Sequence, residues 1–211
     1  MRSSRPLLTA LAASALAVGS LAAWNAAPAA PPTIQAGTYV VDGAHSTVGF
    51  RVRHLGISTV NGQFGQFEGR VTVPRANTLA GMGTTATIQA TSISTNNERR
   101  DNHLRSADFF DVAQYPTITF TSTSIRVLPN DRFALTGNLT MHGVTKPVIL
   151  NGVYTGTATQ GTTTKIALNA EGRINRKDFG LTWNRTIEAG GVVVSEEVSL
   201  VLEIEADRQP S

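Results

Sequence analysis

Residues 92–122 read SISTNNERRDNHLRSADFFDVAQYPTITFTS and place a short polar segment between two stretches in which threonine or serine alternates with apolar residues. Thr95 and Glu98 have the spacing of a capping box, in which each side chain satisfies a backbone N–H left free at a helix start. This spacing predicts a short helix beginning near Asn96. Pro116 then returns the chain to an extended conformation, because proline disfavours the helical region for the residue before it. The segment is therefore a helical insertion between two strands.

The expected helix is almost entirely polar, since Leu104 is its main apolar residue. Only a narrow stripe of it can be buried, so it would act as a lid or plug. Phe109 and Phe110 follow, and a short turn can send these two rings in different directions. The charged side chains of the helix could contact a polar or anionic ligand head group, or could simply form a solvated face with internal ion pairs. Arg100 and His103 are the head-group candidates in this segment.

Outside the insertion, apolar residues recur with period two from Thr38 onward, which predicts an all-β domain. Eight strands result if residues 38–54 count as one bent strand. A closed up-and-down barrel and a two-sheet sandwich both fit this spacing. The apolar parity switches between Ser122 and Ser124, which predicts a β-bulge. Asn61-Gly62 predicts the turn that ends a connection after the first long strand.

The rows that should face inward contain unusually small residues. They are Gly69, Ala86, Ala90, Gly137, Gly152, Ala170 and Gly172. A barrel of eight strands is just wide enough to be filled by side chains or to hold one small ligand. Rows of such small volume favour a hollow interior. The alternative is that the glycines mark bulges and sharp bends.

Residues 92–122 resemble the signature of the YceI family of bacterial periplasmic lipid-binding proteins, SISTxxxxRDxHLRSxDFFDVxxYPTITFxST. The resemblance covers about Gly37 to Ala206 and continues in GTYVVDGAHSTVGFRVRHLGISTVNGQFGQFEG, LTGNLTMHGVTKPVIL and INRKDFGL. It implies an eight-stranded antiparallel barrel, similar to a lipocalin, that holds a long isoprenoid chain such as a quinone tail or a polyprenyl phosphate. No cofactor is expected apart from this bound lipid.

Apolar side chains on the inward rows, the plug and the late loop are expected to line the lipid tunnel. They are Phe50, Val52, Phe67, Ile88, Ala90, Leu104, Phe109, Phe110, Ile118, Phe120, Leu135, Leu139, Leu150, Leu168, Ile174, Phe179 and Trp183.

Two further residues are candidates for contact with a ligand head group. His54 falls on the apolar face of the first long strand, where an imidazole needs a polar partner, either another side chain or the ligand. Arg176 lies in the polar loop that begins at Asn175. It could bind a head group or brace the loop together with Asp178.

Metal-binding and catalytic functions are not expected. The chain has no cysteine, which excludes disulfides and thiolate metal sites. No two of its histidines have the spacing of zinc ligands; they are His45, His54, His103 and His142. No G-x-S-x-G motif is present, and Asp42, His45 and Ser46 all lie at one strand start, where they should not converge as a triad. Two alternatives stay open, a ligand-free envelope module that docks other proteins through its Thr-rich outer face, and a lipid-modifying enzyme.

The N-terminus predicts export. Arg2 and Arg5 precede the apolar run LLTALAASALAVGSLAA and an Ala/Pro-rich stretch, the pattern of a secretory signal peptide. We therefore expect residues 1–30 to be a signal peptide and linker, residues 31–211 to be one barrel domain, and the protein to be periplasmic or secreted.

The charge of the chain argues against nucleic acid as a partner. Loss of Arg2 and Arg5 would reduce 18 basic residues to 16 against 15 acidic ones, so the net charge falls from +3 to +1. A nearly neutral chain with scattered basic residues lacks the electrostatic footprint of a nucleic-acid-binding protein. The expected partner is a long-chain isoprenoid lipid, with transient membrane contact for lipid exchange, a possible homodimer and a role in the envelope stress response.

Overall fold

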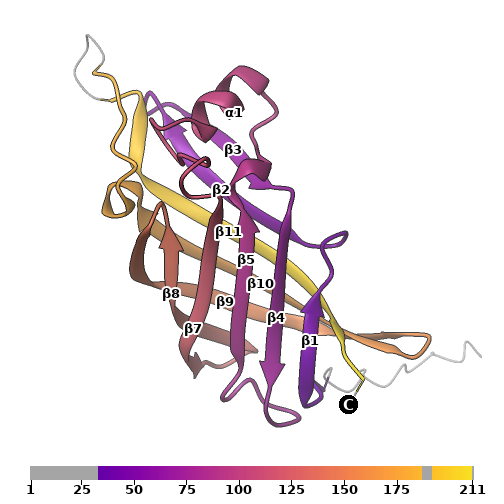
Figure 1. The fold of residues 1–211 in the computed structure, drawn as a ribbon. Coiled ribbons are helices and arrows are strands. Elements are labelled where there is room, and N and C mark those ends of the chain that lie inside the picture. Colours follow the sequence, from indigo (N-terminus) through magenta and orange to yellow (C-terminus); the bar gives the residue numbers. More distant parts are fainter. Residues whose placement is uncertain (1–32, 187–191, 211) are drawn as a thin grey trace, which may run out of the picture. The chain divides into compact units, whose positions relative to one another are not determined.

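A computed structural model describes residues 33–186 and 192–210, so the predicted signal peptide lies outside the described residues. The described chain is built from eleven strand segments, one α-helix and two short 3-10 helices (Figure 1). The strands are β1 (Gly37–Val41), β2 (Thr47–His54), β3 (Ser58–Phe64), β4 (Phe67–Val73), β5 (Gly83–Gln89), β6 (Ile93–Ser94), β7 (Thr117–Val127), β8 (Arg132–Met141), β9 (Val144–Gln160), β10 (Thr163–Asn175) and β11 (Val194–Arg208). The helices are η1 (Ala90–Ser92), α1 (Glu98–Arg105) and η2 (Arg176–Phe179).

The strands close into a barrel in the order β1-β4-β5-β7-β8-β9-β10-β11, because β1 also pairs with β11. Where β1 ends, β2 takes its place along β11, with Phe50 opposite Leu200. The segments β1 and β2 are thus two parts of one bent strand, and β3, paired with β2, extends β4 in the same way. The predicted eight-stranded antiparallel barrel with a helical insertion is confirmed.

Two local predictions have different outcomes. The register of β7 on β8 shifts between Ser122 and Ser124, as the parity switch predicts. The turn predicted at Asn61-Gly62 is wrong, because both residues lie inside β3. A Cβ atom at Gly62 would lie 2.2 Å from Cζ of Phe50, so this glycine allows the close approach of an aromatic ring.

The helix α1 begins later than the capping box predicts. Its N-cap is Asn97, whose side chain accepts a hydrogen bond from the backbone N–H of Arg100 at 2.9 Å. Thr95 is buried, and both its hydroxyl and its backbone N–H donate to the carboxylate of Asp101. Because the buried Asp101 needs these donors, Thr95 cannot serve as the cap.

The end of the barrel opposite α1, where β1 and the connection between β4 and β5 lie (Figure 1), is closed by packed side chains. Tyr39 and Ala206 are fully buried there, and Ile34 and Leu79 are nearly so. The backbone N–H of Asn77 donates to the carbonyl of Ile34 at 2.7 Å, which fixes the entering chain across this end. Within the described residues, no helix is long and apolar enough to cross a membrane.

Candidate ligand-binding cavity

A cavity of about 230 Å³ lies inside the barrel, and its wall is almost entirely apolar. It exceeds the roughly 150 Å³ of an engineered apolar cavity that binds benzene. Inward side chains of β11, among them Leu200 and Leu202, are only partly buried although they face the interior. A filled core would bury them, so the interior retains space that a ligand can occupy.

Most of the residues predicted to line the tunnel do line this cavity. They are Phe50, Val52, Phe67, Ile88, Leu104, Phe109, Phe110, Ile118, Phe120, Leu135, Leu139, Leu150, Leu168 and Ile174. Three others lie elsewhere. Ala90 is buried in η1, Phe179 is buried at the end of η2, and Trp183 packs against Phe109, with 5.1 Å between the ring centroids.

The residues predicted to line the tunnel include none from β11, although alternation places most of its wall residues on an inward row. The wall residues of this strand are Val194, Val198, Leu200, Leu202 and Ile204. Their period-two spacing marks them as one row, the same signal that identified the other strands. Phe133 and Met141, on the inward row of β8, also line the cavity, and so does Phe64, which the sequence interpretation placed on no inward row.

The small inward residues explain the cavity only in part. Gly69, Ala86 and Ala170 line it. A Cβ atom at Gly137 would lie 2.4 Å from Cζ of Phe120, so the space over that glycine is already taken. Gly152 is covered in the same way by Phe133, at 2.3 Å. Aromatic rings on neighbouring strands fill these gaps, and the prediction that both glycines leave open volume is wrong.

An aromatic row connects the barrel wall to the plug. The ring centroids of Phe50 and Phe64 are 5.9 Å apart, and those of Phe64 and Phe110 are 5.8 Å apart in an edge-to-face arrangement. Leu104 of α1 reaches the same cavity. The segment 98–112 therefore covers one end of the cavity with only a few apolar side chains, as the sequence predicts for a plug.

His103 is held on the outer side of this plug. Its ring meets those of Phe109 and Trp183 edge to face, at centroid distances of 5.1 and 4.9 Å. Its Nε2 lies 2.8 Å from the carboxylate of Asp108. His103 is not among the residues that line the cavity, but it remains partly exposed beside the plug.

Arg100 and Arg176, two head-group candidates, are both bonded to the protein itself. Arg100 donates from Nε to the hydroxyl of Thr95 at 2.7 Å and from a terminal nitrogen to the carbonyl of Thr95 at 2.8 Å. Arg176 lines the cavity but is only 4% exposed. It donates to the carbonyls of Leu181, Val194 and Ser195, and burial lowers the pKa of its guanidinium.

Arg176 therefore braces the late loop, but through backbone carbonyls rather than through the expected partner Asp178. His54, the remaining candidate, lies at the end of β2 opposite Val194 and is half-buried. It is absent from the cavity wall as the structure describes it. The four head-group candidates thus surround the α1 end of the barrel without forming one cluster inside it.

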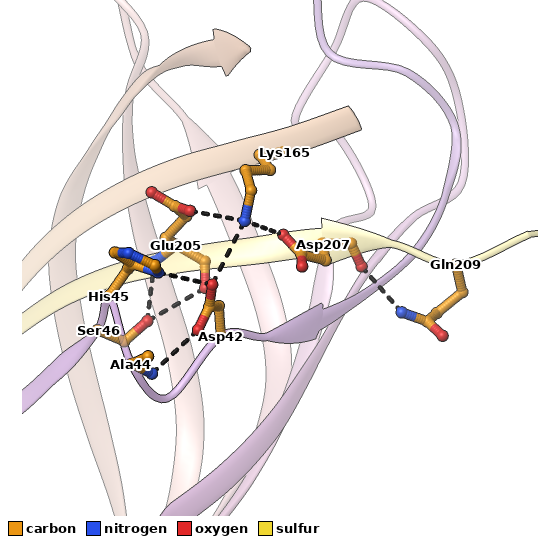
Figure 2. A network of polar contacts seen from close by, with 8 residues as sticks. All are labelled: Asp42, Ala44, His45, Ser46, Lys165, Glu205, Asp207 and Gln209. Atoms are coloured by element: carbon orange, nitrogen blue, oxygen red, sulfur yellow. Dashed lines mark hydrogen bonds and ion pairs between the residues drawn. The ribbon is translucent and has the colours of Figure 1, made fainter. Parts of the chain in front are cut away.

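A polar network lies outside the cavity, where the junction of β1 and β2 meets β10 and β11 (Figure 2). Atoms of Asp42, His45 and Glu205 lie within 4.8 Å of one another, close enough for metal ligands. Figure 2 shows the ammonium group of Lys165 among these carboxylates, 3.3 Å from Asp42, 2.9 Å from Glu205 and 2.6 Å from Asp207. The ammonium group of the lysine thus supplies the positive charge that a bound metal ion would otherwise have to supply.

In the same network, Asp42, His45 and Ser46 are not arranged as a catalytic triad. Nδ1 of His45 lies 2.8 Å from Asp42, and this hydrogen bond lowers the pKa of Asp42 to about 2 and raises the pKa of His45. The hydroxyl of Ser46 instead donates to the carbonyl of Glu205 at 3.1 Å and accepts from its N–H at 3.0 Å. These contacts join the bent strand to β11.

The sequence model of the YceI-like domain family matches residues 39–206 of this chain. The chain belongs to the YceI family. Protein YceI of Salmonella arizonae is 41% identical over 177 residues, covering 82% of this chain and 88% of the relative. The crystal structure of Campylobacter jejuni YceI is 32% identical, covers 80% of this chain and 96% of that one, and superposes with a TM-score of 0.63.

A more distant structure shares the fold of this YceI-family protein. It is a polyisoprenoid binding domain from Saccharophagus degradans, implicated in plant cell wall breakdown. It is 18% identical, covers 83% of this chain and 100% of that domain, and superposes with a TM-score of 0.59.

Proposed function

We propose that this YceI-family protein binds the chain of an isoprenoid lipid in its barrel and stores or carries it without chemical change. The observation that carries the proposal is the apolar cavity of about 230 Å³ inside a closed barrel. The polyisoprenoid binding domain of the same fold supports the choice of lipid class. Burial of such a chain contributes about 0.8 kcal/mol per CH₂ group.

The apolar wall of the cavity determines where the head group of the ligand lies. A polar head group inside the cavity would find almost no partner, and burying it there would be costly. The head group therefore stays at the α1 end, where Arg100, His103, His54 and Arg176 lie. Of these, Arg100 and His103 retain exposure to solvent beside the plug.

The proposed cellular setting rests on the sequence. Arg2 and Arg5 before an apolar run support export to the periplasm or beyond. A carrier in that compartment would exchange its lipid with a membrane and would sequester or supply lipid during envelope stress.

The experiment is to fill the cavity with a side chain. Ala170 lines the cavity, while Asn169, its neighbour on β10, is exposed on the outer face. Protein purified from its native host should yield a long-chain isoprenoid on organic extraction and mass spectrometry, both for the parent and for Asn169→Trp. Ala170→Trp should lose the lipid, because the indole ring occupies the volume that the chain requires.

Stability distinguishes a hollow interior from a filled one. In a filled core, Ala170→Trp would cost about 1–3 kcal/mol through overpacking. In a hollow barrel the free energy of unfolding of the lipid-free variant should stay within about 1 kcal/mol of the parent. Strong destabilisation, together with a parent that carries no lipid, would reject the carrier function and favour the ligand-free envelope module.

A further inference from the structure

Three apolar side chains are exposed together at one end of the barrel. Leu55 is 37% exposed and Ile57 is 80% exposed, both at the turn between β2 and β3. Val192, just before β11, is 43% exposed. The backbone N–H of Leu55 donates to the carbonyl of Val193 at 2.8 Å, so the turn and this segment are adjacent. We call Leu55, Ile57 and Val192 the apolar rim.

The apolar rim is continuous with the cavity. Val52 of β2 lines the cavity and lies three residues before Leu55 in the chain. Val194 also lines the cavity and lies two residues after Val192. β2 and β11 are paired here, with His54 opposite Val194. The turn between β2 and β3 lies at the same end of the barrel as α1 (Figure 1). An apolar path therefore leads from the cavity wall to the outer surface along two neighbouring strands.

The backbone conformation at position 55 does not favour leucine, so the needs of the turn do not explain why Leu55 is there. Its φ is 53°, and that of Gly56 is 72°, both in the left-handed region. A bulky residue is disfavoured there, whereas asparagine before glycine is the preferred pair in a tight hairpin. A strained, exposed leucine at this position points to a function outside the fold.

Two arginines lie beside the rim. Arg53 folds back on the hairpin and donates to the carbonyl of Gly56 at 2.8 Å and to the hydroxyl of Thr59 at 3.2 Å. Arg185 lies over the ring of Trp183, 5.9 Å from its centroid. Among the described residues, neither arginine has an acidic partner within 4 Å. Exposed apolar side chains with adjacent cations suit the surface of an anionic bilayer.

We propose that the apolar rim docks this barrel on an anionic lipid bilayer, with Leu55 and Ile57 inserted at the boundary between head groups and acyl chains. A lipid chain then passes between the bilayer and the cavity along Val52 and Val194 without crossing water. This role in transfer rests on the proposed function, but the docking itself is a separate property.

The test measures binding to vesicles. The full mature protein should cosediment with vesicles of phosphatidylethanolamine and phosphatidylglycerol, and more weakly with phosphatidylcholine alone. The double variant Leu55→Asn, Ile57→Ser should bind at least about tenfold more weakly, because two apolar side chains no longer enter the bilayer. Arg185→Gln should weaken binding to the anionic vesicles by about fivefold and leave binding to phosphatidylcholine nearly unchanged.

Two controls make the result specific. Ile149→Ser removes a side chain that is 54% exposed on β9, away from the rim, and should bind vesicles as the parent does. Leu55→Asn restores a preferred turn, so it should raise the melting temperature or leave it unchanged while binding falls. Loss of binding through unfolding would give the opposite change in melting temperature.

Several results would overturn the proposal. One is failure of the parent to bind either kind of vesicle, and another is an equal loss of binding in Ile149→Ser. A third is that the parent is a dimer, that Leu55→Asn, Ile57→Ser makes it a monomer, and that neither protein binds vesicles. Native mass spectrometry of the same samples reports bound lipid independently. A lipid-loaded parent that ignores vesicles rejects the docking alone, whereas vesicle binding by a protein that never holds lipid rejects the proposed function alone.

Discussion

The two ends of the barrel are built by different means. The closed end is packed, with Tyr39 fully buried and its hydroxyl donating to the carbonyl of Gln35 at 2.8 Å. The α1 end is covered by a mostly polar helix that is tied down by side-chain bonds to backbone carbonyls. Arg105 donates to the carbonyls of Thr91 and Ile93, each at 2.8 Å. The closed end should therefore determine stability, while the α1 end can open at little cost.

The largest effect is expected at the closed end. Tyr39→Ala should lower the free energy of unfolding by about 3–5 kcal/mol, because it leaves a cavity in packed surroundings. Tyr39→Phe should cost only about 1 kcal/mol, the value of one hydrogen bond. Denaturant unfolding of lipid-free protein measures both.

The matched change at the other end is Phe110→Ala. Phe110 is only partly buried and borders space that is already empty, so its removal should cost less than half as much as Tyr39→Ala. Equal losses at the two positions would show that both ends are packed alike and would remove the basis of the comparison.

An intermediate effect is expected from the bonds that hold α1. Arg105→Ala should cost about 1 kcal/mol in unfolding free energy, since the hydrogen bonds to the carbonyls of Thr91 and the buried Ile93 are lost. Hydrogen exchange should accelerate in residues 98–105 while β8 and β9 keep their protection, and a bound lipid should leave faster. Arg99→Ala removes an exposed arginine from the same helix and should change neither rate. Unaltered exchange in Arg105→Ala would mean that the plug is held by other contacts.

The sequence predicts the strands better than it predicts the interior volume of the barrel. Alternation identified most of the strands, the bulge at Ser122 and most of the inward rows, because side-chain direction in a strand follows from position alone. It missed β3, which the sequence interpretation took as a connection. The interior volume was harder to infer. Gly137 and Gly152 are small, yet Phe120 and Phe133 on neighbouring strands cover them, and strand register decides this.

Contacts between distant segments account for the remaining differences at the candidate site. Arg176 bonds to carbonyls of Val194 and Ser195, well beyond its own loop, so local spacing suggested the wrong partner. Lys165 reaches Asp42 only because the barrel closes between β1 and β11, whereas Glu205 lies on the strand that pairs directly with β10. Long-range ion pairs of this kind leave no periodic signal in a single sequence.

The smallest expected effect is the pH dependence of the network around Lys165. The hydrogen bond from His45 lowers the pKa of Asp42 to about 2, so the stabilisation from this carboxylate is present above its usual pKa and is lost as the pH falls toward 2. The pKa of His45 is raised, chiefly by its hydrogen bond to Asp42, so its contribution is present below its usual pKa and is lost as the pH rises through the raised value.

His45→Ala should therefore lower the melting temperature slightly at pH 5.5 and have almost no effect at pH 9. The difference should not exceed a few degrees, because His45 is largely exposed and such pairs contribute little. The charges facing His45 are those of Asp42, Glu205 and Lys165, and the pKa of Lys165 is raised by its bonds to Asp207 and Glu205, so the lysine keeps its charge at both pH values. A larger loss at pH 9 than at pH 5.5 would mean that His45 acts through packing as a neutral ring, and that the network closing β1 onto β11 does not depend on its charge.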